Sequence, residues 1–263
     1  MKTPAITLFI LGIIFSCTNT GNQVKEAGIK TDSGTNVMGT NNAYTDTPLW
    51  VLPESFKKIQ SQFKVFDKFP YVMDSLFFQK LENSNPNPFP GEIIAALSQN
   101  HQSASMFGGP EYDIKICIQI DSIKQFSDYD AWVSTSDIGM VVESDAYPLH
   151  QITFDNNITG YTWFIRYSTT DACPFGQGTI VFLTLVSDNN VLACTQIADQ
   201  SGGADAPYWS DNTVYGKLTK QLQISGTKTM RSGGDMDENG NDIVEQSANE
   251  FRLVYENRKW IEK

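Results

Sequence analysis

Regular alternation of apolar and polar residues in the second half of the chain is the feature that most restricts the fold. Between residues 111 and 124, isoleucines occupy every second position, at Ile114, Ile116, Ile118 and Ile120. A period of two places successive side chains on opposite faces of a strand, so this segment is predicted to be a half-buried strand. Similar apolar runs follow at residues 140–143, 149–154, 161–167, 179–186, 191–197, 214–230 and 251–261.

The connections between most of these runs are short and rich in turn-forming residues. Residues 187–190 (Ser-Asp-Asn-Asn) join two apolar runs, and residues 256–259 (Glu-Asn-Arg-Lys) do the same near the C-terminus. Short turns connect antiparallel strands, whereas parallel strands need long crossovers. Residues 111–263 are therefore predicted to form a mainly antiparallel β meander or sandwich. The run 179–186 is apolar on both of its faces and should be a central strand.

The preceding part, residues 48–100, is predicted to form short helices that flank this sheet. Phe56, Ile59 and Phe63 have the spacing of one helical face, behind Pro53 and Glu54, which suit a first turn. Further helices are predicted over residues 72–81 and 92–98, with prolines between them as breakers. The predicted fold class is α+β, with short N-terminal helices followed by the antiparallel strands.

The N-terminus has the pattern of an export signal. About 11 mostly apolar residues follow the positive charge of Lys2, a run too short to span a membrane stably. It ends at Ser16-Cys17, which resembles the lipobox of bacterial lipoproteins, although that family prefers a smaller residue than Phe15. The resemblance implies a cleaved signal peptide, residues 1–16, and acylation of Cys17. An ordinary signal peptide, cut a few residues later, is the alternative.

If Cys17 is acylated, its lipid chains would anchor the protein to a bilayer of the bacterial cell envelope, and we expect this to be the outer membrane. Residues 17–47 are rich in Asn, Thr, Gly and Ser and cannot bury enough apolar surface to offset the entropy of ordering. They are predicted to be a flexible tether with a span of roughly 30 Å. Residues 48–263 are predicted to be the globular domain.

The charge of the chain restricts its partners. There are 19 basic and 30 acidic side chains, and loss of Lys2 with the signal peptide would leave a net charge near −12. Nucleic acids and anionic lipid surfaces attract basic proteins, so this excess of acid argues against nucleic acid as a partner.

Three cysteines besides Cys17 are an odd number for a compartment that permits disulfides. A bridge between Cys173 and Cys194 would close a loop of about 20 residues and stabilise the fold by about 3 kcal/mol. Cys117, between isoleucines, is predicted to be a free thiol. A catalytic cysteine is the weaker interpretation, because only His101 and His150 could serve as its base.

Residues 235–242 carry the most specific local pattern. Oxygen-bearing side chains at alternate positions and a glycine at the sixth position have the spacing of a calcium loop. The candidate ligands are Asp235, Asp237, Asn239, Asn241 and Glu245. The twelfth position is Gln246 instead of a bidentate acid, so we predict a hairpin turn, with a weak calcium site as the alternative. No other cofactor is predicted.

No catalytic or nucleotide-binding motif stands out, and Gly176-Gln177-Gly178 is interpreted as a turn before a strand. The sequence thus favours a membrane-anchored envelope lipoprotein without enzymatic activity, which binds a protein or glycan partner or contributes to surface assembly. The alternative is a protein that binds or hydrolyses envelope glycans with acids and rings, namely Asp128, Asp130, Trp132, Trp163 and Trp209. A groove lined by these rings, with two carboxylates about 5–10 Å apart, would favour the alternative.

Overall fold

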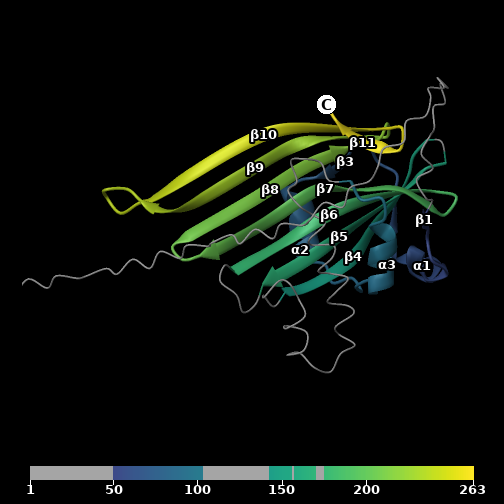
Figure 1. Cartoon of the computed structure of the whole chain (residues 1–263), viewed down its shortest axis with the longest axis horizontal. Coiled ribbons are helices and arrows are strands. Elements are labelled where there is room, and N and C mark those ends of the chain that lie inside the picture. Colours follow the sequence, from purple (N-terminus) through teal and green to yellow (C-terminus); the bar gives the residue numbers. More distant parts are fainter. Residues whose placement is uncertain (1–49, 103–141, 156, 170–174) are drawn as a thin grey trace, which may run out of the picture. The chain divides into compact units, whose positions relative to one another are not determined.

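The computed structural model describes residues 50–102, 142–155, 157–169 and 175–263 (Figure 1). Every described residue belongs to one compact unit, Thr47–Lys263. Cys17, the predicted tether and the predicted strand at residues 114–120 lie outside the described residues.

Short elements make up the N-terminal part of the described chain. They are β1 (Trp50–Val51), α1 (Glu54–Ile59) with the 3-10 helix η1 (Gln60–Gln62), β2 (Lys64–Phe66), β3 (Tyr71–Met73), α2 (Ser75–Glu82) and α3 (Gly91–Leu97). Pro53 and Pro90 directly precede α1 and α3. Proline has no N–H to leave unsatisfied at a helix start, so both helices begin where the sequence predicts, within one residue.

The remaining strands follow one another along the chain. They are β4 (Val142–Thr153), β5 (Thr159–Thr169), β6 (Phe175–Ser187), β7 (Asn190–Asp205), β8 (Tyr208–Leu218), β9 (Gln223–Met236), β10 (Asp242–Glu256) and β11 (Lys259–Glu262). Each pairs antiparallel with the next, in the sheet order β11-β10-β9-β8-β7-β6-β5-β4 (Figure 1). The predicted α+β class and antiparallel meander are confirmed.

The short N-terminal strands pair with three different strands of this sheet. β2 pairs with β4 in parallel, whereas β1 pairs with β7 and β3 with β8 in the antiparallel sense. The helix predicted over residues 72–81 therefore begins later than expected, because Tyr71–Met73 form β3. Asp74 follows and accepts a hydrogen bond from the Phe77 amide at 3.0 Å, which caps α2.

One predicted run is in fact two strands. Residues 214–230 are divided between β8 and β9 by a tight turn, in which the Thr219 amide donates to the Gln223 carbonyl at 2.9 Å. Leu222 in this turn has a positive φ of 55°. Leucine rarely adopts that conformation, so the sequence offers no turn signal at this position.

The apolar side chains gather in two clusters on opposite faces of β6. Val181 and Leu183 belong to the first, which we name the α2 cluster because α2 contributes Phe78 and Leu81. Ile180 and Phe182 belong to the second, the α3 cluster, to which α3 contributes Ile93, Ile94 and Leu97. Successive strand residues point to opposite faces, so β6 is covered on both sides, as predicted for residues 179–186. Among the described residues no helix is long and apolar enough to cross a membrane.

Candidate ligand-binding groove

The predicted sugar-binding rings do not form one site. Trp163 is completely buried in the α3 cluster, where it stacks on Phe182 with the ring centroids 4.5 Å apart and donates from Nε1 to the Thr184 hydroxyl at 2.9 Å. Trp163 therefore belongs to the core, which corrects its assignment as a ligand-binding ring. Asp128, Asp130 and Trp132 lie outside the described residues.

Trp209 is half-buried near the start of β8, and its partners come from the β9–β10 hairpin. Its Nε1 donates to Asp242 Oδ2 at 2.9 Å, and the Arg231 guanidinium lies 5.6 Å from its ring centroid. Oδ1 of Asp242 accepts from the Gly234 amide at 2.7 Å. These contacts fix the ring on the sheet beside Arg231, so Trp209 orients an arginine.

The predicted calcium loop is the turn between β9 and β10. Asp237 accepts from the amides of Asn239 and Asn241, both at 2.8 Å, and from the Asn241 side chain at 3.0 Å. These hydrogen bonds, above all those from Asn241, lower the pKa of Asp237. Gly240 has a φ of 80°, which favours glycine. The loop thus has the geometry of an Asx-stabilised turn, and calcium binding stays a prediction.

The side chain of Cys194 is fully buried, and burial raises the pKa of its thiol to about 12. The strand register places it opposite Thr184, nine residues along β6 from Phe175, the first residue of that strand. At about 3.3 Å per residue this is a distance of about 30 Å, far more than a disulfide spans. Cys173 lies outside the described residues, so the bridge to Cys194 stays a prediction, which this register disfavours.

Two rows of polar side chains cross one face of the sheet. Directly opposite residues of antiparallel strands point to the same face, so the register defines each row. The first row, on β4 to β8 in order, is Asp145, Arg166, Thr179, Gln200 and Thr213. The second row, on β5 to β9 in order, is Ser168, Gln177, Gly202, Asp211 and Arg231.

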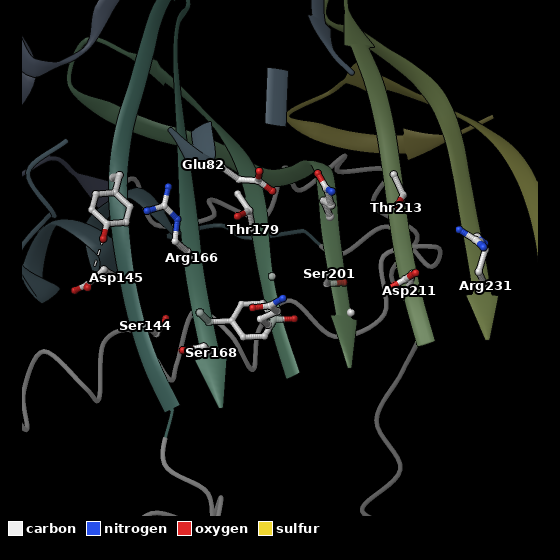
Figure 2. Close-up of a pocket in the computed structure, with 16 residues that line it drawn as sticks. Glu82, Ser144, Asp145, Arg166, Ser168, Thr179, Ser201, Asp211, Thr213 and Arg231 are labelled. Carbon is white, nitrogen blue, oxygen red and sulfur yellow. Dashed lines mark hydrogen bonds between the residues drawn. The ribbon is translucent and has the colours of Figure 1, made fainter. Parts of the chain in front are cut away.

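These rows line a groove of about 860 Å³ that runs across the strands (Figure 2). The groove begins where α2 ends. The next row on the same face, which includes Phe164 and Val181, is apolar and lies in the α2 cluster. Beyond the last turn of α2 no helix among the described residues packs on this face and its side chains are polar, so the end of α2 sets one boundary of the groove.

Arg166 is held in place at this boundary. Its Nη2 donates to the Leu81 carbonyl at 2.7 Å, which satisfies an acceptor at the C-terminus of α2. Its guanidinium lies 5.5 Å from the ring centroid of Tyr147 and 5.6 Å from that of Phe164. Glu82 also lines the groove here. At the other end lies Arg231, which Trp209 orients, so each end of the groove carries a stacked arginine.

Glycines open the floor of the groove. Gly178 and Gly202 line it, and a Cβ built on Gly202 would lie 2.7 Å from Asp211 Oδ1. Gly178 alternates with Gln177 and Thr179, so a Cβ built on it would point to the other face of the sheet, 2.8 Å from the Cβ of Ser201 and from the ring of Tyr167. Glycine therefore lets neighbouring polar side chains pack on the backbone. The expected turn at Gly176-Gln177-Gly178 is wrong, because these residues lie within β6.

The two histidines lie elsewhere. His150 Nδ1 is 2.9 Å from the hydroxyl of Tyr71, which also lies 3.4 Å from Thr162 Oγ1. Burial, with a smaller effect of Lys64, lowers the pKa of His150 to about 4, and burial raises the pKa of Tyr71. Tyr71 therefore donates to a neutral His150. The backbone of His101 pairs with that of Cys194 in a single parallel β-bridge.

No family model matches the chain, and neither a curated protein nor a solved structure is found that resembles it. Within the described ranges, no group of three or more His, Cys, Asp or Glu side chains is placed to hold a metal ion. The groove is thus the best-defined candidate site. No sequence pattern indicates this groove, because its strand residues come from six strands and only the register joins them.

Proposed function

We propose that this protein is a membrane-anchored envelope lipoprotein without enzymatic activity, whose groove binds an extended polyhydroxyl chain, that is, a glycan. The observation that carries the proposal is the pair of polar rows along the groove. Hydroxyl, amide, carboxylate and guanidinium groups follow one another across the strands, and together they provide both donors and acceptors. Sugars present the same mixture of donors and acceptors along their length.

The charges of the groove favour a neutral ligand. Glu82, Asp145 and Asp211 contribute three negative charges, and Arg166 and Arg231 contribute two positive charges. An anionic polymer would meet more carboxylates than guanidinium groups, and a cationic one would meet the stacked arginines at both ends. The volume of about 860 Å³ lies within the range of small-molecule sites, so an oligosaccharide segment is of suitable size.

The spacing of Asp145 and Asp211 does not match the acid pair of a glycoside hydrolase, so these two carboxylates support binding over hydrolysis. Asp145 lies on β4 and Asp211 on β8, which are four strand spacings apart in the sheet. Neighbouring strands are about 4.8 Å apart, so these carboxylates are separated by about 19 Å. Paired acids of glycoside hydrolases lie about 5–10 Å apart.

Calorimetric titration of the full chain, purified in detergent, with neutral cello-, chito-, malto- and manno-oligosaccharides tests the proposal. We expect binding of at least one series. Gln200→Leu and Thr213→Val remove hydrogen-bonding groups from the first row and should each weaken it about three- to tenfold. Thr229→Val is the matched control, because Thr229 extends the same row by one strand but does not line the groove.

Two results would count against the proposal. Absence of binding for every oligosaccharide would reject the ligand class. If Gln200→Leu and Thr213→Val bind the sugar with the same affinity as Thr229→Val, the sugar binds outside the groove. Release of shorter products during the titration would contradict the non-enzymatic part.

A further inference from the structure

β10 presents a long open edge in the described part of the chain. Residues Asp242–Val254 pair with β9 on one side, with a register shift between Ile243 and Glu245, whereas β11 covers only Leu253–Glu256 on the other. The side chains from Asp242 to Glu250 are all exposed. The opposite margin of the sheet is better covered, because β2 pairs with part of β4 and the Phe89 amide donates to the Ala146 carbonyl at 2.7 Å. An open edge offers its backbone groups to another strand.

The β10–β11 hairpin shows which residues of β10 face this edge. The Lys263 amide donates to the Arg252 carbonyl at 3.0 Å, so the backbone groups of Arg252 point away from β9. This direction alternates along an antiparallel strand. The backbone N–H and C=O groups of Val244, Gln246, Ala248 and Glu250 therefore point outward as well.

We propose that the β10 edge pairs with the β10 edge of a second copy of this chain, antiparallel and about a two-fold axis. Such a pair places outward-facing residues opposite each other, so only registers that join even-numbered positions are allowed. The register centred on Ser247 sets Val244 opposite Glu250 and Gln246 opposite Ala248. It uses all four outward-facing positions of each copy.

The neighbouring registers are less favourable. Centring the pair on Gln246 would set Asp242 opposite Glu250 at both ends, and like charges directly opposite destabilise a sheet. Centring it on Ala248 would set Val244 opposite Arg252, whose carbonyl already accepts from Lys263. The register centred on Ser247 has no like-charge pair, and it reaches Arg252 only beyond the four outward-facing positions, where Arg252 lies opposite Asp242, a residue of opposite charge.

The charges at the two ends of β10 are complementary in this arrangement. The β9–β10 turn is acidic, with Asp235, Asp237, Glu238 and Asp242. The β10–β11 end has an excess of basic residues, with Arg252, Arg258, Lys259 and Lys263 against Glu256 and Glu262. Antiparallel pairing brings the acidic turn of each copy to the basic end of the other, which is the charge arrangement that selects a second copy as the partner.

The pairing would also extend the polar face. Thr213 in the first row lies opposite Thr229, which lies opposite Ala248 of β10. In the pair, Ala248 lies opposite Gln246 of the second copy, and Gln246 lies opposite Arg231 within its own chain. The first row of each copy would then continue into the second row of the other, on one sheet.

Single cysteines on β10 test the register. Ser247 would face Ser247 of the second copy as a non-hydrogen-bonded pair, with Cα atoms about 4.5 Å apart, which a disulfide spans. Asn249 is the matched control on the same face, since its two copies would be offset by four residues, about 13 Å. On mild oxidation of the full chain in detergent, we expect a covalent dimer for Ser247→Cys, and none for Asn249→Cys or the parent.

A second variant separates pairing from folding. The N–H of residue 248 points away from β9 and takes no part in the β9–β10 pairing. Ala248→Pro removes this N–H and should therefore leave the thermal unfolding of the protein largely unchanged. Combined with Ser247→Cys it should abolish the cross-link, whereas Ala248→Ser should keep it. Equal cross-linking at positions 247 and 249, none at either position, or a cross-link that survives Ala248→Pro would each overturn the proposal.

Discussion

Whether a tryptophan is part of the core or a surface ring depends on which strands surround it. In the sequence, Trp163 lies within the predicted strand 161–167 and Trp209 lies between the predicted strands 191–197 and 214–230, and both were candidate ligand-binding rings. In the fold, Trp163 lies on the face of β5 that α3 covers, and Trp209 lies near the start of β8, where no described helix packs. The sequence pattern predicts the strand, but it does not predict which element packs on each face of that strand.

Replacing each ring measures this difference. Trp163→Ala removes a fully buried ring, its stacking on Phe182 and a donor to Thr184, and should lower the free energy of unfolding by about 3–5 kcal/mol. Trp209→Ala removes a half-buried ring and should cost about 1 kcal/mol. Urea denaturation of both variants checks this prediction. Equal costs would contradict the buried position of Trp163.

His150 should make the stability of the fold sensitive to acid. Its pKa is lowered in the folded chain from 6.5 to about 4, so the unfolded chain binds the proton first. The contribution of His150 to the free energy of unfolding is fully present above pH 6.5 and decreases as the pH falls from 6.5 to 4. Below pH 4 this group causes no further loss. Allowing for partial solvent screening of the half-buried ring, we expect a loss of about 1–2 kcal/mol.

Comparison with a variant separates the effect of this histidine from that of carboxylates protonated over a similar pH range. His150→Gln keeps an acceptor for the Tyr71 hydroxyl but cannot be protonated in this range. The difference in unfolding free energy between parent and His150→Gln should therefore shrink as the pH falls from 6.5 to 4. A constant difference would contradict the assignment.

Among the strands, the apolar pattern identified the buried portions and missed the polar extensions. Residues 179–186 of β6 and 191–197 of β7 were predictable because their side chains enter the two clusters. The first residues of β6 and the last of β7, which form the groove floor, are rich in Gly, Ser and Gln. They are held by pairing with neighbouring strands, and pairing leaves no mark on a single sequence.

The site was harder to predict than the fold for the same reason. Asp145, Arg166 and Thr179 are separated by many residues in the sequence and meet only because β4, β5 and β6 pair in one register. A shift of one residue would turn each side chain to the other face. The acidic turn was recognised as a turn because Asp237 and Gly240 act locally, within five residues of each other.

The β9–β10 turn should depend on Asp237 and not on Asp235. Asp237→Ala removes three hydrogen bonds within the turn, whereas Asp235 lies in β9 opposite Ile243. Amide hydrogen exchange should become faster around residues 236–242 in Asp237→Ala and change little in Asp235→Ala. Because the turn satisfies Asp237 itself, we expect the same exchange rates with calcium as with a chelator. Calcium-dependent protection that both variants lose would instead establish a metal site.

For the whole molecule, the predicted lipid anchor determines where the groove and the β10 edge would act. Acylation would confine copies to one surface and raise the local concentration available for β10 pairing. Two or three acyl chains hold a protein far more firmly than one. The anchor is proposed from the apolar run that ends at Ser16-Cys17. Cys17→Ser removes the thiol that would be acylated.

Mass spectrometry of the mature N-terminus decides whether this anchor exists. We expect the first residue to be Cys17 with a mass increase equal to a diacylglycerol group, and we expect the protein in the membrane fraction. Cys17→Ser should release the chain from membranes, whereas Cys117→Ser, the matched control, should not. An unmodified N-terminus beyond residue 17 would favour an ordinary signal peptide. Membrane association that persists in Cys17→Ser would mean that another part of the chain contacts the bilayer.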